Sequence, residues 1–151
     1  MNNQIALYQQ VILDHNRNPK NFKKLCPASH FSEGYNPLCG DHLWVYLNVC
    51  KNKTISDISF NGEGCAISKA SASLMTDIIK GKSIRDVKEL SDIFLNMLKD
   101  PNNKDLQLEK IGKLKIFSGV SKYPSRIKCA SLCWHALIGA LSSDQKVSTE
   151  E

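Results

Sequence analysis

The chain has 151 residues, of which 42% are hydrophobic and 23% are charged, and its formal net charge is +5 at pH 7. These values fit one globular domain with a core of moderate size. The first residues lack the features of a secretory signal, and no segment approaches about eighteen uninterrupted apolar residues, so neither an export signal nor a membrane span is expected. We therefore predict a cytoplasmic protein with no membrane partner.

The positive charge gives little support for nucleic-acid binding. The densest basic stretch, residues 17–24, holds a single aromatic residue, Phe22. A surface that binds nucleic acid combines a broader basic face with aromatic stacking platforms. We interpret the stretch as a solvated loop and expect no nucleic-acid partner.

The first predicted elements are a helix and a small sheet. Apolar residues recur at helical spacing over residues 4–16, which predicts an amphipathic helix. Three runs rich in β-branched and aromatic residues then predict antiparallel strands at residues 30–35, 42–50 and 54–60. The Asn52-Lys53 pair is suited to a hairpin connection between the last two strands.

The rest of the chain is predicted to be helical, with recognisable start and stop signals. Gly81 can end one helix, Ser83 and Asp86 have the spacing of a capping box that starts the next, and Pro124 can start the last. The predicted helices are residues 66–80, 84–100, a short one within 106–120, and 124–141.

Strands first and helices afterwards indicate an α+β domain, with a small antiparallel sheet of about three strands packed against several helices. We expect residues 1–141 to form a single domain. The polar tail, residues 142–151, is predicted to be disordered.

Six cysteines are the main chemical signal in the chain. In a reducing compartment cysteines serve metals or redox chemistry more often than disulfides, and a chain of this length can fold without disulfides. We therefore favour a metal or sulfur site over a disulfide framework. The cysteines are Cys26, Cys39, Cys50, Cys65, Cys129 and Cys133.

Three of these cysteines lie at boundaries between predicted elements, where side chains from distant segments can meet at one end of a sheet. Cys39 and Asp41 lie on the turn before the long strand, Cys65 starts a helix, and Cys129 is near the start of the last helix. The positive end of a helix dipole favours the thiolate form that metal binding and sulfur chemistry require. The basic residues Arg126 and Lys128 beside Cys129 also favour its thiolate. Tight backbone paths near these cysteines are permitted by Gly40, Gly62 and Gly64.

Three thiolates and one carboxylate form a tetrahedral set suited to Zn²⁺, and three thiolates with a replaceable fourth ligand would also suit an iron–sulfur cluster. The carboxylate of Asp41 is the weakest ligand in such a set, so it is the natural one to exchange. A zinc hydrolase is disfavoured, because a closed set leaves no position for an activated water. No C-x-x-C pair is present, and spacing alone therefore leaves these alternatives open.

Three segments, "NPLCGD", "GEGCAISKASASLMTD" and "YPSRIKCASLCWHAL", resemble the cysteine segments of the SufU-type branch of the IscU/NifU N-terminal iron–sulfur assembly family. The opening "LYQQVILDHNRNPKNF" is similar to that branch's first helix and loop. Two features favour this branch. Sixty-three residues separate Cys65 from Cys129, and Lys128 stands where IscU-type proteins carry a histidine ligand.

The resemblance implies an IscU/SufU-like fold and a Zn²⁺ site held by Cys39, Asp41, Cys65 and Cys129. It implies a sulfur acceptor that activates a pyridoxal-phosphate cysteine desulfurase (SufS-like), rather than a stand-alone enzyme. In this scheme a desulfurase side chain replaces Cys39 on the metal, and Cys39 takes the persulfide sulfur. Arg126 is the expected stabiliser of the freed thiolate.

Two alternatives remain open. One is a scaffold on which a transient 2Fe-2S cluster, or iron, is bound and passed to downstream cluster-assembly proteins. The other is a module whose zinc is purely structural. Cys133, where the branch usually has alanine, lies one helical turn from Cys129; we favour a buried apolar role for it over an auxiliary thiol. Cys26 and Cys50 match no motif of the family.

Overall fold

The sheet contains the three antiparallel strands that the sequence predicts. In the computed structural model, which describes residues 3–142 and 146–149, these are β1 (His30–Asn36), β2 (Asp41–Val49) and β3 (Ile55–Glu63). Asn36 pairs with Asp41 across the β1–β2 hairpin, so residues 37–40 form a tight turn. The predicted α+β class is confirmed.

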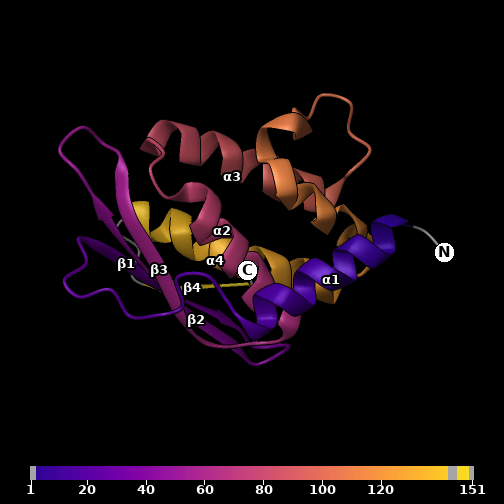
Figure 1. Ribbon diagram of the computed structural model, residues 1–151, viewed down its shortest axis with the longest axis horizontal. Helices are drawn as coiled ribbons and strands as arrows, with labels where there is room; N and C mark the ends of the chain where they lie inside the picture. Colours follow the sequence, from indigo (N-terminus) through magenta and orange to yellow (C-terminus); the bar gives the residue numbers. More distant parts are fainter. Residues whose placement is uncertain (1–2, 143–145, 150–151) are drawn as a thin grey trace.

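A fourth strand, β4 (Lys146–Ser148), corrects the prediction of a disordered tail. It pairs in parallel with β1, so the strand order is β3-β2-β1-β4 and the sheet is mixed (Figure 1). Three residues are too few to show strand alternation in the sequence, and the open edge of β1 supplies the pairing groups that order them. Residues 143–145 and 150–151 of the predicted tail lie outside the described part of the chain.

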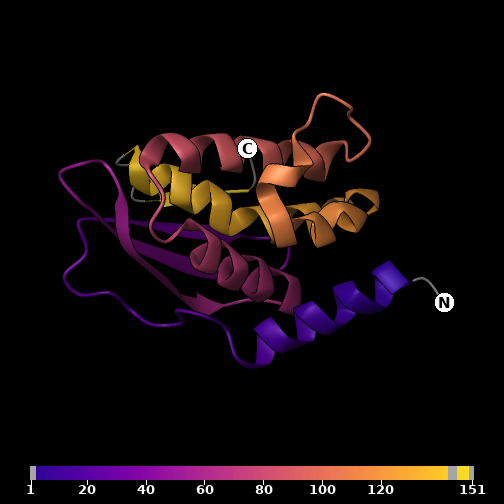
Figure 2. The same cartoon turned by 45° about the horizontal axis from the view of Figure 1, so that its top comes forward.

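Two helices, α2 (Ala66–Ile79) and α4 (Pro124–Leu141), lie across one face of the sheet (Figures 1 and 2). The first helix, α1 (Asn3–Arg17), packs beside α2, and α3 (Ile84–Lys99) packs beside α4. As the sequence predicts, Ser83 Oγ accepts a hydrogen bond from Asp86 N at 3.1 Å and caps α3, and Pro124 begins α4.

The segment between α3 and α4 differs from the short helix that the sequence predicts. It is the 3-10 helical segment η1 (Leu108–Lys122), interrupted at Gly112, whose φ of 52° is left-handed. A glycine adopts this conformation without a Cβ clash, so the chain changes direction there. Successive turns, three residues apart, still bury four apolar side chains against the core: Ile111, Leu114, Phe117 and Val120.

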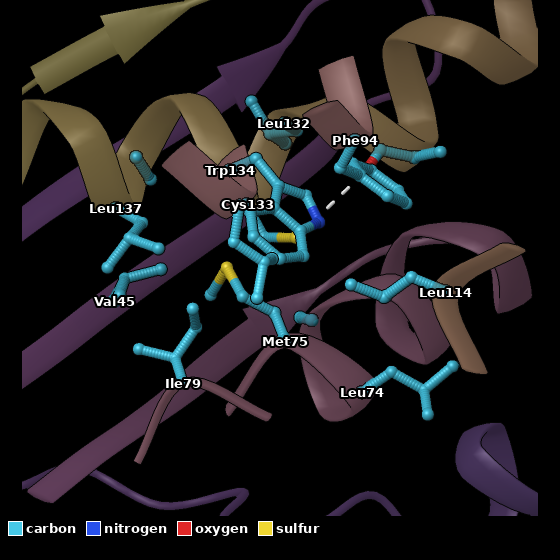
Figure 3. Close-up of a cluster of buried hydrophobic side chains, with 14 of the residues drawn as sticks. Val45, Leu74, Met75, Ile79, Phe94, Leu114, Leu132, Cys133, Trp134 and Leu137 are labelled. Carbon is cyan, nitrogen blue, oxygen red and sulfur yellow. Dashed lines mark hydrogen bonds between the residues drawn. The ribbon is translucent and has the colours of Figure 1, made fainter. Parts of the chain in front are cut away.

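The core is centred on Trp134, which is fully buried on α4 between α2 and α3 (Figure 3). Its ring stacks on Phe94 with centroids 4.7 Å apart, and its Nε1 donates a hydrogen bond to Ser71 Oγ at 3.2 Å. Ser71 in turn donates to the carbonyl of Ala130 at 2.7 Å. The only polar atom of the indole is therefore satisfied, which makes a buried tryptophan compatible with the core. Among the described residues, no helix combines the length and the apolar character needed to cross a membrane.

Candidate metal centre

Two of the three predicted boundary segments meet at one end of the sheet, and the third, which carries Cys65, borders them. The β1–β2 turn carries Cys39, the first residue of β2 is Asp41, and the second turn of α4 carries Cys129. One sulfur or oxygen atom from each of these residues lies within 4.8 Å of the others. Residues 90 positions apart in the sequence thus form a compact group of potential ligands.

Asp41 is the most firmly held of the three. Its side chain is 1% exposed, and Oδ1 accepts a hydrogen bond from the backbone N–H of Cys65 at 2.9 Å. Oδ2 is contacted by Asn36 Nδ2 at 3.4 Å. These donors fix the carboxylate in one orientation.

Strand alternation separates Asp41 from His42. His42 points to the opposite face of the sheet, where it hydrogen-bonds Glu33 and stacks on Trp44 with ring centroids 4.1 Å apart. It is therefore not part of the group.

Gly64, in the connection from β3 to α2, lets the chain pass close to Asp41. A Cβ at this position would lie 3.1 Å from Asp41 Oδ1 and 3.0 Å from Ser68 Oγ. That hydroxyl is buried and has no hydrogen-bond partner within the described residues. A polar atom without a partner thus lies on the α2 side of the candidate centre.

Cys39 differs from the other two because it is exposed. It precedes Gly40, whose φ of +74° closes the turn, and Gly40 N donates to Asn36 O at 2.8 Å. The Cys39 sulfur lies 3.4 Å from the sulfur of Cys129. Cys39 therefore faces both the buried group and solvent.

Cys65 borders the group without belonging to the set of three. It is the N-cap of α2, and its Sγ accepts a hydrogen bond from Ser68 N at 3.4 Å. Hydrogen bonding from Cys129, opposed by burial and assisted by Ser68 N–H, lowers the pKa of Cys65 to about 6. The expected thiolate at this helix start is therefore supported.

Cys129 does not follow the same expectation. Its side chain is 4% exposed, and its hydrogen bond to Cys65 together with burial raises its pKa above that of an ordinary thiol. The prediction that nearby basic residues would favour its thiolate is wrong for the metal-free protein. A thiol has one proton, so Cys129 donates to either Cys65 or Cys39 at any moment.

Arg126 is exposed on the first turn of α4, three residues before Cys129. Its guanidinium lies 4.4 Å from the centroid of the Tyr123 ring, a cation–π contact. Its charge also reaches Tyr8, where burial raises the pKa of the phenol and Arg126 partly opposes that effect. Among the described residues no hydrogen bond joins Arg126 to Cys39, so its expected role remains a prediction.

Comparison with known proteins assigns the chain to a family. The profile of the NifU-like N-terminal domain matches residues 7–130, which include all four predicted ligands. The chain belongs to the NifU-like N-terminal domain family. The resemblance found in the sequence is therefore confirmed.

Relatives of this NifU-like domain carry two different names. The chain is 40% identical over 140 residues to the zinc-dependent sulfurtransferase SufU of Bacillus subtilis, covering 93% of this chain and 92% of that protein. It is 38% identical over 135 residues to the iron–sulfur cluster assembly scaffold protein IscU of Streptococcus pyogenes, covering 89% and 82%.

A solved structure supports the fold. A crystal structure from Fervidobacterium islandicum AW-1, described as an iron–sulfur cluster assembly scaffold protein for the SUF system, matches with a TM-score of 0.82 at 33% identity, covering 90% of this chain and 97% of that one.

The donor set of this NifU-like domain fits a zinc ion. Zinc–sulfur bonds of about 2.3 Å in a tetrahedron place ligand atoms about 3.8 Å apart. The 3.4 Å between the sulfurs of Cys39 and Cys129, and the 4.8 Å limit of the whole group, are compatible with that spacing. Cys65 would supply the fourth ligand from the edge of the group.

Sequence reasoning missed Asn36, the residue that begins the "NPLCGD" motif. It is fully buried, and its Nδ2 contacts Asp41 Oδ2 at 3.4 Å and Cys129 Sγ at 3.8 Å. Its place before Pro37 in a tight turn was an available signal, because asparagine is common there. That signal predicts a turn and says nothing of contact with Cys129.

The other cysteines lie outside the centre. Cys133 is fully buried, 3.5 Å from Ser71 Oγ, and burial raises its pKa to about 12. This confirms the favoured buried role. Cys26 and Cys50 are exposed free thiols, and all six cysteines are unpaired, as expected for a chain without a disulfide framework.

Proposed function

We propose that this NifU-like domain acts in iron–sulfur cluster assembly as a zinc-dependent acceptor of persulfide sulfur from a cysteine desulfurase. The observation that carries the proposal is the asymmetry of the candidate ligands. Asp41 and Cys129 are buried, and Cys65 is exposed but held at the start of α2 by the hydrogen bond from Ser68 N. Cys39 is exposed on a glycine-containing turn. The thiol on the turn can therefore leave the group and meet a partner while the donors on β2, α2 and α4 stay in place.

We assign the ligand set Cys39, Asp41, Cys65 and Cys129 to Zn²⁺. When bound, zinc would hold the cysteines as thiolates and stabilise the fold of the β1–β2 turn. The low pKa of Cys65, about 6, favours a thiolate at neutral pH without the metal. Cys129 needs the positive charge of the zinc ion to lose its proton, because its hydrogen bond to Cys65 and burial oppose ionisation.

The reaction proposed for Cys39 is a thiol–persulfide exchange. The Cys39 thiolate attacks the outer sulfur of the desulfurase persulfide, and a sulfur–sulfur bond forms on Cys39 as the bond to the desulfurase cysteine breaks. The desulfurase cysteine leaves as a thiolate, and no external oxidant or reductant is needed. Such chemistry requires reduced thiols, which is consistent with the expected cytoplasmic location.

Arg126 is proposed to stabilise the Cys39 thiolate when that side chain turns outward. The guanidinium is permanently charged and exposed at the start of α4, three residues before Cys129. Its cation–π contact with Tyr123 limits the positions that it can occupy.

The test is to map persulfide after mixing the zinc-loaded protein with a SufS-like desulfurase and cysteine. We expect the sulfur on Cys39, and we expect Cys39→Ser to abolish both acceptance and stimulation of the desulfurase. Cys50→Ser is the matched control, because Cys50 is also exposed but lies at the other end of β2. Normal sulfur acceptance by the Cys39→Ser variant would refute the assignment.

A scaffold for a transient 2Fe-2S cluster is the second candidate, supported by the relatives named as scaffolds. Anaerobic isolation separates the two functions. Bound zinc without visible charge-transfer absorption supports the sulfur acceptor, whereas stoichiometric cluster absorption supports the scaffold and transfer to downstream proteins.

A further inference from the structure

We infer that the C-terminal segment, residues 146–149, holds the candidate metal centre in place through Asn36, with Thr149 and Asn36 acting as positioning residues. The inference rests on the proposed zinc site. It adds a determinant of metal retention that lies outside the ligand-bearing segments of the chain.

Asn36 uses its complete hydrogen-bonding capacity. Its side chain is fully buried, and the two hydrogens of Nδ2 face Asp41 Oδ2 at 3.4 Å and Cys129 Sγ at 3.8 Å. Its Oδ1 accepts from Leu38 N at 3.3 Å and from Thr149 Oγ1 at 3.1 Å. An asparagine amide has two donor hydrogens and two acceptor positions, so all four are occupied.

The neighbours of Asn36 permit only one orientation of the amide. The backbone N–H of Leu38 can only donate, so the oxygen of Asn36 must face it. Rotating the amide by half a turn would place two N–H groups against each other and two acceptors, Asp41 and Asn36 Oδ1, together. Nδ2 therefore points at the centre.

The C-terminal strand places Thr149 beside this amide. In the parallel pairing of β4 with β1, Val147 lies opposite Gly34 and Ser148 opposite Tyr35, so the next residue reaches the level of Asn36. Thr149 N donates to Tyr35 O at 3.2 Å and continues the ladder by one residue. Val147 anchors the segment by packing against the core.

The contacts of Asn36 are divided unequally among the candidate ligands. Its N–H groups donate to Asp41 and Cys129, whereas its oxygen accepts from Leu38 N and Thr149 Oγ1. A residue that orients ligands from behind affects how long they remain on a metal. The segment thus stabilises two of the three ligands that must stay when Cys39 leaves.

The experiment measures Zn²⁺ release from the loaded protein to a chromophoric chelator, with no desulfurase present. Thr149→Val keeps the shape of the side chain and removes the hydroxyl, and we expect release about fivefold faster. Thr149→Ser retains the hydroxyl and is the matched control, with release at the wild-type rate.

A second pair of variants tests whether Thr149 acts through Asn36. Asn36→Ala should lower zinc affinity by about 10–100-fold. Adding Thr149→Val to Asn36→Ala should then change nothing further, because the partner of the hydroxyl is already gone. In the metal-free protein, Thr149→Val should also speed amide hydrogen exchange at Leu38, a readout that needs no zinc.

Unchanged zinc release and unchanged Leu38 exchange in Thr149→Val would overturn the inference, as would additive effects in the double variant. The proposed function fails separately. A protein that shows these zinc effects but never accepts persulfide sulfur would retain the positioning role of Thr149 and lose the assignment as a sulfur acceptor.

Discussion

Cys129 and Cys133 lie four residues apart on α4, and the contrast between them shows what makes a thiol part of a site. Both are buried, with exposed fractions of 4% and 0%. Cys129 lies at the sheet end, where it meets Cys39 at 3.4 Å and Asn36 at 3.8 Å. Cys133, one turn further, meets Ser71 Oγ at 3.5 Å inside the core. Helix position and burial are similar, so the neighbours decide the chemistry.

The pKa values of the two thiols are both raised, but for different reasons. For Cys133 the main cause is burial, which raises its pKa to about 12. For Cys129 the main cause is the hydrogen bond that it donates to Cys65. Both thiols are therefore protonated in the metal-free protein. A metal ion bound by Cys65 and Cys129 would replace the hydrogen bond between them, whereas the burial of Cys133 would stay the same.

The largest expected difference between Cys129 and Cys133 is the effect of their replacement on zinc affinity. In Cys129→Ser a hydroxyl replaces a soft thiolate donor, and we expect zinc affinity to fall by more than about 100-fold, beyond the loss typical of a residue behind the ligands. Competition with a chromophoric chelator measures it. Cys133→Ala should keep wild-type affinity, and equal affinities for wild type and Cys129→Ser would remove Cys129 from the ligand set.

The next effect concerns the pH at which Cys65 reacts in the metal-free protein. Because its pKa is lowered from 9.0 to about 6, its thiolate persists as the pH falls toward 6 and is lost below that value. Iodoacetamide labelling followed by peptide mapping should give a midpoint near pH 6 for Cys65, while Cys133 stays unlabelled through pH 9.

Removing the donor tests the cause of this shift. In Cys129→Ala the hydrogen bond to Cys65 is absent, so the midpoint should move upward toward 9.0. A wild-type midpoint already near 9 would contradict the interpretation, and so would a midpoint that does not move in the variant.

The smallest effect is the contribution of Cys133 to stability. Cys133→Ala removes one buried sulfur next to Trp134 and Ser71, which should lower the free energy of unfolding by about 1 kcal/mol and the melting temperature by about 2–4 °C. Thermal unfolding of the metal-free protein measures the change. If zinc affinity fell as it does in Cys129→Ser, the distinction between the two thiols would be wrong.

Local signals in the sequence predicted most of the elements. The capping serine of α3 and Pro124 at the start of α4 act within a few residues, so the sequence contains the whole cause. The short strand β4 could not be predicted in this way. Its order depends on the open edge of β1, more than one hundred residues earlier in the chain.

For the candidate site, too, the sequence predicted what depends on local signals and missed what depends on long-range contacts. Cys39, Asp41, Cys65 and Cys129 were recognised from their places at element boundaries and from family motifs, and the structure brings three of them within 4.8 Å. Helix dipoles predict a thiolate at both helix starts, which agrees with the lowered pKa of Cys65 but not with the raised pKa of Cys129. Burial and a neighbouring thiol outweigh a partial helix charge there, and neither can be read from adjacent residues.

The sequence by itself determined the α+β order of elements, the family and the candidate ligands, because propensity, capping and motif spacing are local properties. The tertiary structure alone decided which thiols are exposed, which ligand thiol keeps its proton, and how Thr149 and Asn36 meet behind the centre. These depend on contacts between segments up to 113 residues apart, which form only when the sheet is complete.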